Sequence, residues 1–224
     1  MAFSSRSSPA VFHAYRHLPA LLALAAAMTI FVVLAQVAHA QEETAVGRIG
    51  RIVGEVTVVR GAGSVPAQLG MIVLQDDAVA TGSDGRVEIL YTDGSTVVLG
   101  SGTTVSIARY APPTAGAGTA LLDLIDGILR VTLSAGRTWK SFEVRSATAV
   151  ASVRSTDWIV DADGPSTAIF VIDGSVAVDS RAGLGGIVLA AGQGTDVRAG
   201  EAPDPPKVWG QQRVDGVLAR TALP

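Results

Sequence analysis

The alternation of apolar and polar positions along the chain predicts β-strands, and it is clearest in the stretch 80–107. Val87, Ile89 and Tyr91 occupy every second position of the segment 86–91. A period of two is typical of a strand that buries one face. We therefore expect this stretch to form the nucleus of an all-β domain.

A turn signal follows this strand and predicts a hairpin. Asp93-Gly94 readily takes the left-handed backbone angles of a two-residue turn, and a second β-rich run comes after it. Pairing through such a turn would place Ile89 opposite Val98 and Leu90 opposite Val97. Both faces of the hairpin would then carry apolar residues, so we expect both faces to be covered.

Short β-rich runs recur through the rest of the chain, and each of them opens with glycine. Glycine favours the turn and the alternating β-branched residues favour the strand. The spacing of the runs is irregular, and the segment 119–128 is the only weak candidate for a helix. The sequence thus predicts an all-β fold, either a meandering antiparallel sandwich or a rolled, solenoid-like β domain. The runs are 54–58, 85–89, 94–98, 127–131, 174–178 and 186–189.

The first 40 residues have the pattern of a secretory signal peptide. Arg6 and Arg16 give a basic start, the segment 18–37 is almost wholly apolar, and Ala38-His39-Ala40 supplies a small-x-small cleavage site. We expect cleavage after Ala40 and export to the periplasm, with full secretion as an alternative. An uncleaved membrane anchor is the other interpretation, because the apolar run is long enough to span a bilayer. After cleavage no membrane span is expected.

The composition argues against an enzyme. The chain has no cysteine, and its three histidines all precede residue 41. Disulfides, thiol chemistry and thiolate or histidine metal sites are therefore excluded after cleavage. A serine or threonine nucleophile would need a lysine or carboxylate base, and the two lysines, Lys140 and Lys207, stand in no catalytic motif. Several acidic residues, such as Asp84, Asp93, Asp163 and Asp173, adjoin glycine in expected turns. We expect no catalysis and no cofactor.

Charge and acidic motifs narrow the classes of ligand further. Beyond residue 40 the chain has 15 basic and 20 acidic residues, a net charge of −5, without a basic stripe. Such a chain is a poor candidate for binding nucleic acid. Asp76-Asp77 could supply half a calcium site, but no loop of further oxygen ligands follows, so we interpret the pair as a turn and expect no bound metal.

The order of several motifs resembles the FecR domain family. The resemblance extends over about residues 48–198, and departs from the family pattern at Ala147, where proline is usual, and at Ser155, where glycine is usual. The matching segments are Thr81-Gly82, Asp93-Gly94-Ser95, Val98-Leu99-Gly100, 104–107, 121–133, 142–160 with Val153-Arg154 and Thr156-Asp157-Trp158, 173–178 and 188–193.

This resemblance implies a domain organisation and a role in envelope signalling. We expect a signal peptide at 1–40, a FecR-like all-β domain at 41–200, and a proline-containing tail at 201–224. The end of this tail, 209–223, could dock as a short helix or stay flexible, and we favour weak order. FecR proteins proper carry a cytoplasmic anti-sigma region and a membrane helix before this domain. A signal peptide stands in their place here, so we expect no direct contact with a sigma factor.

Four residues are candidates for contact with a partner: Trp139, Arg154, Asp157 and Trp158. Tryptophan on a β surface can anchor a protein interface or stack on a sugar, although filling the core is the common alternative. Arg154 would point to the face opposite Val153, where it could pair with Asp157 or mark a contact surface. We expect a non-catalytic sensor, adaptor or scaffold that binds an envelope protein. The alternatives are a glycan or cell-wall binding module and a purely structural envelope protein.

Overall fold

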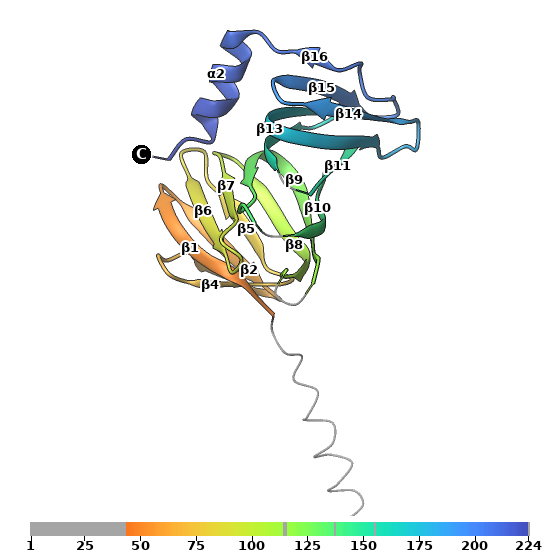
Figure 1. Cartoon of the computed structure of the whole chain (residues 1–224). Helices are drawn as coiled ribbons and strands as arrows, with labels where there is room; N and C mark the ends of the chain where they lie inside the picture. Colours follow the sequence, from red (N-terminus) through yellow and green to blue (C-terminus); the bar gives the residue numbers. More distant parts are fainter. Residues whose placement is uncertain (1–43, 114–115, 137, 155, 224) are drawn as a thin grey trace, which may run out of the picture. The chain divides into compact units, whose positions relative to one another are not determined.

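The computed structural model describes residues 44–113, 116–136, 138–154 and 156–223 (Figure 1). These residues form sixteen strands and one short helix, which confirms the predicted all-β class. The predicted signal peptide and Ser155 lie outside the described residues. Within the described ranges, no helix combines the length and the hydropathy that crossing a membrane requires.

Most strands are short, but β9 and β13 have 15 residues each. The segment 119–128, considered above as a weak helix, belongs to β9. The elements are β1 (Ala45–Val53), β2 (Val56–Arg60), β3 (Gly63–Pro66), β4 (Ile72–Leu74), β5 (Ala78–Thr81), β6 (Arg86–Tyr91), β7 (Thr96–Leu99), β8 (Thr104–Ala111), β9 (Gly118–Thr132), β10 (Trp139–Arg145), β11 (Ala149–Val153), β12 (Thr156–Asp163), β13 (Ser166–Ser180), β14 (Gly186–Ala190), β15 (Gln193–Arg198), β16 (Lys207–Val208) and α2 (Gln211–Arg220).

The strands form two sheets that share β9 and β13. Sheet A has the order β4-β1-β6-β7-β9-β12-β13-β15-β16, and sheet B has the order β3-β2-β5-β8-β9-β10-β11-β13-β14. The first half of β9 lies in sheet B and its second half in sheet A, whereas β13 crosses in the opposite direction. One hydrogen-bonded network therefore holds both sheets.

Glycine stands at three places where the chain passes from one sheet to the other. Gly54, Gly127 and Gly174 have φ angles of +63°, +91° and +85°, a region that side chains with a Cβ rarely adopt. At Gly127 the space is filled as well, because a Cβ there would lie 2.5 Å from the Cα of Thr103. The Thr103 hydroxyl bonds to both the N–H and the C=O of Ile128. The crossing is thus fixed by backbone angle and by close packing.

The second half of the domain is a closed barrel of five strands. β9, β10, β11, β13 and β12 pair in a ring that returns to β9. The rolled form of the prediction describes this part well. The β9–β10 pair runs parallel, and the other described pairs are antiparallel.

The predicted register of the central hairpin is wrong by one residue. Ile89 pairs with Val97 rather than with Val98. The Tyr91 N–H donates to the Ser95 carbonyl oxygen at 2.9 Å, so the loop between β6 and β7 has three residues instead of two. The Ser95 hydroxyl donates to the Asp93 carboxylate at 2.7 Å and fixes this longer turn.

One apolar core fills the space between the two sheets. It takes residues from nearly every strand and includes both Trp139 and Trp158. Four aromatic rings meet in it, with Trp139 edge-on to Phe142 at 5.1 Å and Tyr91 edge-on to Tyr110 at 5.3 Å. Burial raises the pKa of the Tyr91 phenol well above its usual range, so this ring stays neutral.

The expectation of a weakly ordered tail is wrong. Helix α2 follows β16 and packs on the outer face of sheet A (Figure 1), where Val217 and Trp209 join Ile128, Ile159 and Phe170 in a second, smaller core. Trp209 stacks on Phe170 with 5.0 Å between the ring centroids. This stack explains the order of the tail, because it buries the one large ring that the tail carries.

Charged contacts hold α2 at both ends. Near its start, Asp196 of β15 accepts hydrogen bonds from Arg213 and from Lys207. At its end, Arg220 pairs with Asp161 of β12. The Arg213 guanidinium also lies 3.6 Å above the Trp209 ring. The hydrogen bonds from Arg213 lower the pKa of the Asp196 carboxyl below its ordinary value.

We predict that Gly127→Ala lowers the free energy of unfolding by about 2–4 kcal/mol, since it adds backbone strain and a clash with Thr103. Urea denaturation of the variant and of wild type measures the difference. Gly216→Ala in α2 is the matched control, since a Cβ at Gly216 meets no atom within 4 Å. It should leave stability unchanged or raise it by up to about 1 kcal/mol. Equal changes in the free energy of unfolding for the two substitutions would contradict the conclusion that the crossing requires glycine at position 127.

The docking of α2 should weaken in acid. Folding lowers the pKa of Asp196, so its stabilisation is present above the ordinary aspartate pKa of about 4 and is lost as the pH falls through the lowered value. Relative to the intrinsic rate, which itself slows in acid, amide hydrogen exchange over 211–220 should accelerate below about pH 4. Asp196→Asn should accelerate it already at neutral pH, whereas Asp215→Asn, within the helix, should not. Unchanged exchange in Asp196→Asn would rule out a role of Asp196 in the docking of α2.

Candidate functional site

The structure places Trp139 and Trp158 in the core, away from the surface. Their exposed fractions are 1% and 0%. Trp158 lies on β12 between the two sheets, and Trp139 begins β10 within the aromatic group described above. A side chain without exposed surface cannot form an interface in the folded domain, so the alternative of core filling describes both residues. The candidate site loses its two aromatic members.

Asp157 lies on sheet A and is bound by a different arginine from the one considered in the sequence. The Arg130 guanidinium donates to both of its carboxylate oxygens, at 2.9 and 2.6 Å, and the Thr132 hydroxyl adds a contact at 3.2 Å. These bonds raise the pKa of Arg130. The suggested pair of Arg154 with Asp157 is therefore wrong, and Asp157 ties β12 to β9.

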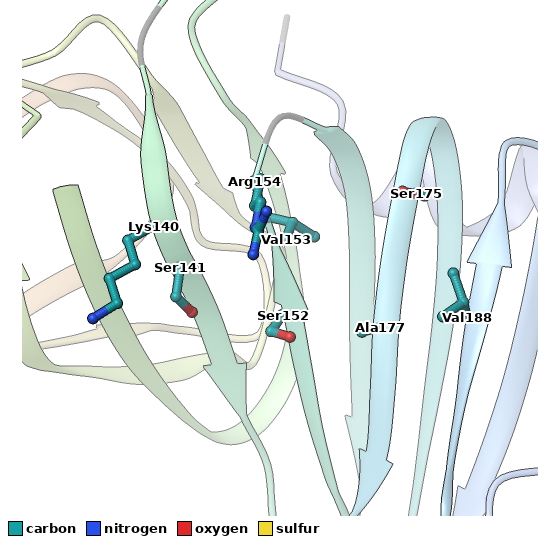
Figure 2. Close-up of a pocket in the computed structure, with 8 residues that line it drawn as sticks. All are labelled: Lys140, Ser141, Ser152, Val153, Arg154, Ser175, Ala177 and Val188. Carbon is teal, nitrogen blue, oxygen red and sulfur yellow. The ribbon is translucent and has the colours of Figure 1, made fainter. Parts of the chain in front are cut away.

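Arg154 is the predicted site residue that the structure leaves exposed. It follows β11 on the outer face of sheet B and, with Lys140 of β10, borders a shallow groove of about 490 Å³ (Figure 2). The groove crosses four neighbouring strands, β10, β11, β13 and β14. Its lining residues are Lys140, Ser141, Ser152, Val153, Arg154, Ser175, Ala177 and Val188.

Small side chains hollow out this face. Ser152 of β11 and Ala177 of β13 are direct neighbours across the two strands, and Ser141 and Ser175 flank them. Such residues leave room above the sheet that larger side chains would fill. The groove ends at Val188, which is 66% exposed at the edge of the sheet. The site therefore combines hydroxyl groups, an apolar rim and two cations.

Some basic side chains near the groove have acidic partners and others do not. Arg145, further along β10, is held by Asp123 through two hydrogen bonds of 2.6 and 2.9 Å, which raise the pKa of Arg145. Among the described residues, neither Lys140 nor Arg154 has a carboxylate within ion-pair distance. These two cations are available to a negatively charged ligand.

A second hollow, of about 320 Å³, lies on sheet A beside the end of the chain. Its arginines already have partners, since Arg51 lies 3.8 Å from Glu88 and Arg130 binds Asp157. It therefore offers less to a charged ligand than the groove on sheet B.

The groups that could support chemistry have structural partners. In the part of the chain that the structure describes, no three acidic or histidine side chains are placed to hold a metal. Asp77 accepts hydrogen bonds from Arg60 and from the Leu74 N–H, which confirms that Asp76-Asp77 forms a turn. The buried hydroxyls of Ser146, Thr148 and Thr167 bond to one another.

Comparison with known proteins agrees with this architecture. Residues 77–177 match the family model described as FecR protein. The segment 77–177 is thus of the FecR type. The match begins before β5, ends within β13, and includes Lys140, Arg154 and most of the groove. It supports a role in cell-envelope signalling. No curated protein matches the sequence.

The fold also resembles a solved structure. A candidate anti-sigma factor from Parabacteroides distasonis ATCC 8503, known from two crystal structures, aligns with a TM-score of 0.50 and 21% identity. The alignment covers 63% of this chain and 64% or 63% of that chain. This chain thus spans less than two thirds of the length of that protein, and the similarity establishes a shared fold.

Sequence reasoning identified Arg154 but missed the groove beside it. The groove is made of small residues from strands that lie far apart in the sequence, among them Ser152 and Ala177. Serine and alanine at alternate strand positions are common on any solvated sheet face. Without the pairing of β11 with β13, nothing in the sequence brings them together.

We predict that alanine substitutions of the two polar candidate residues, Asp157 and Arg154, lower the free energy of unfolding by different amounts. Asp157→Ala should lower the free energy of unfolding by about 1–3 kcal/mol, because it leaves Arg130 without its two charged hydrogen bonds. Arg154→Ala should change it by less than about 0.5 kcal/mol, as expected for an exposed side chain without a partner. Chemical denaturation of both variants decides the matter. A larger loss for Arg154→Ala would overturn the assignment.

Proposed function

We propose that this chain is a periplasmic, non-catalytic protein that binds an envelope protein as a sensor, adaptor or scaffold in envelope signalling. The FecR match and the exported type of N-terminal sequence support this role. The groove on sheet B, with Arg154 and Lys140 on its border, carries the proposal. The partner contributes an acidic segment of its chain that lies in this groove.

Charge and shape both favour such a segment. The two cations lack carboxylate partners among the described residues, so acidic side chains would complement them. The hydroxyls of Ser152 and Ser175 can donate hydrogen bonds to a peptide backbone, whereas the Ser141 hydroxyl already donates to Glu143. The small residues leave space for side chains of the partner. The groove is open and shallow, which suits a segment of a protein better than a small molecule that must be enclosed.

The described residues lack the feature that would favour a glycan. Sugar-binding sites commonly use an exposed aromatic ring as a stacking platform. Trp139, Trp158 and Trp209 are each at most 6% exposed, and the lining of the groove contains no aromatic residue. A protein partner is therefore the better-supported of the two proposals.

Photocrosslinking in intact cells tests the proposal. A photoreactive residue at Ser152, on the floor of the groove, should give a reproducible adduct with one envelope protein. The same residue at Ser106, on the outer face of β8 in the same sheet, should not. Adding Lys140→Glu and Arg154→Glu should reduce the adduct about tenfold or more, because repulsion replaces attraction.

Three results would contradict the proposal. They are adducts of equal yield from both positions, adducts only with cell-wall sugars, and an adduct from Ser152 that persists after both charge reversals. The folding of the reversed variant is checked by its urea midpoint, which should match that of wild type since both side chains are exposed.

A further inference from the structure

Strand β14 is an unprotected edge of sheet B. In the described structure it pairs with β13 alone. Its residues, 186–190, read Gly-Ile-Val-Leu-Ala and include neither a charged residue nor a proline. Soluble proteins usually protect an edge with lysine, proline or a bulge, because free backbone groups invite another strand. The opposite edge of sheet B, β3, ends in Pro66 and so follows that rule.

The register shows which backbone groups of β14 are free. The Ser180 N–H donates to the Gly185 carbonyl oxygen at 3.0 Å, and hydrogen-bonded pairs alternate from there. Ile187 and Leu189 therefore bond to β13, while Gly186, Val188 and Ala190 direct their N–H and C=O groups outward. The Ala190 N–H is taken by the side-chain oxygen of Gln193 at 2.9 Å. The outward groups of Gly186 and Val188 face the open edge.

The side chains along this edge are apolar as well as uncharged. Val188 is 66% exposed and Leu184, in the turn before β14, is 53% exposed. Ile187 packs against the edge of the main core and is only partly buried. An added strand would cover these side chains and satisfy the outward N–H and C=O groups of Val188 together.

We propose that β14 pairs antiparallel with β14 of a second copy of this chain, with Val188 on the two-fold axis. Self-association requires a segment that complements itself. With Val188 at the centre, Gly186 faces the partner's Ala190, and Ile187 faces the partner's Leu189. The small residues Gly186 and Ala190 thus meet each other, and because Leu189 is fully buried, the apolar contact is made chiefly by the exposed Val188 of each copy.

Charge also permits this arrangement. The nearest charged residues, Asp179 and Arg181, both lie at the turn end of the β13–β14 hairpin. An antiparallel pair puts the two turn ends at opposite ends of the interface, so the like charges of the two copies stay apart. The central contact is apolar on both sides.

The dimer joins two copies of sheet B into one continuous sheet. Because Val188 is also the rim of the groove, the two grooves would then open side by side on the same face. A five-residue strand pair is small compared with a standard protein interface, so we expect a weak dimer whose population depends on concentration. This inference does not require the acidic partner proposed above, and each can fail without the other.

Disulfide formation by the otherwise cysteine-free chain tests the pairing. Val188→Cys supplies one thiol per chain, and the two Cα atoms of a hydrogen-bonded antiparallel pair lie about 5.5 Å apart, within the range that a disulfide bridges. Mild oxidation of the expressed chain should give mostly covalent dimer. Val65→Cys, on the other edge of sheet B and 48% exposed, is the matched control and should stay largely monomeric.

A charged residue introduced at position 188, on the proposed two-fold axis, gives a second test. Val188→Lys places two like charges opposite each other and should weaken dimerisation about tenfold or more in sedimentation equilibrium, whereas Val65→Lys should not. Both variants should keep the wild-type urea midpoint, since both side chains are exposed. The proposal is overturned by equal crosslinking of the two cysteine variants, by a dimer that Val188→Lys leaves intact, or by crosslinking of Val188→Cys in cells to a different protein only.

Discussion

The passage of one strand between two sheets is the constraint on which this fold depends. A strand that leaves one sheet and continues in the other must turn sharply while it keeps its pairing on both sides. The chain does this with glycine at positive φ, and at Gly127 the neighbouring Thr103 leaves no room for a side chain. Because β9 and β13 each belong to both sheets, the core between the sheets is a single cluster.

The sequence around the crossings shows a recurrence that the structure makes meaningful. Gly54, Gly127 and Gly174 each stand two positions after isoleucine and two positions before valine or leucine, with valine again two positions later. The residues two and four positions after each of these glycines are buried, for example Leu129 and Val131 after Gly127. The irregular spacing of the glycine-opened runs hid this pattern, since only three of the runs, 54–58, 127–131 and 174–178, show it.

The two outer faces of the domain differ, and this difference directs attention to sheet B. Sheet A carries α2 across β9, β12 and β13, with a second core beneath it. Its acidic residues Asp157, Asp161 and Asp196 are bound by basic side chains. Around the groove of sheet B, Lys140 and Arg154 have no such partners within the described residues. One face is thus used for stability, and the other is available for binding.

Local pattern predicted the strands well, but it could not decide questions that depend on tertiary contacts. The Asp93-Gly94 turn accepts a loop of two or three residues, and the Tyr91–Ser95 bond selects the longer one. The neighbours of Trp158 are the polar Asp157 and the apolar Ile159. Because these neighbours do not share one character, the alternation of polar and apolar residues could not show which face of the sheet carries Trp158. Ile159 is apolar because α2 covers it, and the docking of α2 depends on the stacking of Trp209 on Phe170, distant in sequence.

The central claim is that the outer face of sheet B is the binding face. Hydrogen–deuterium exchange of the chain, alone and with solubilised envelope membranes, tests it most directly because it reports every strand at once. The account predicts slower exchange in β11, the second half of β13 and β14, with no change in α2. Slower exchange confined to α2 and β12, or no difference anywhere, would contradict it.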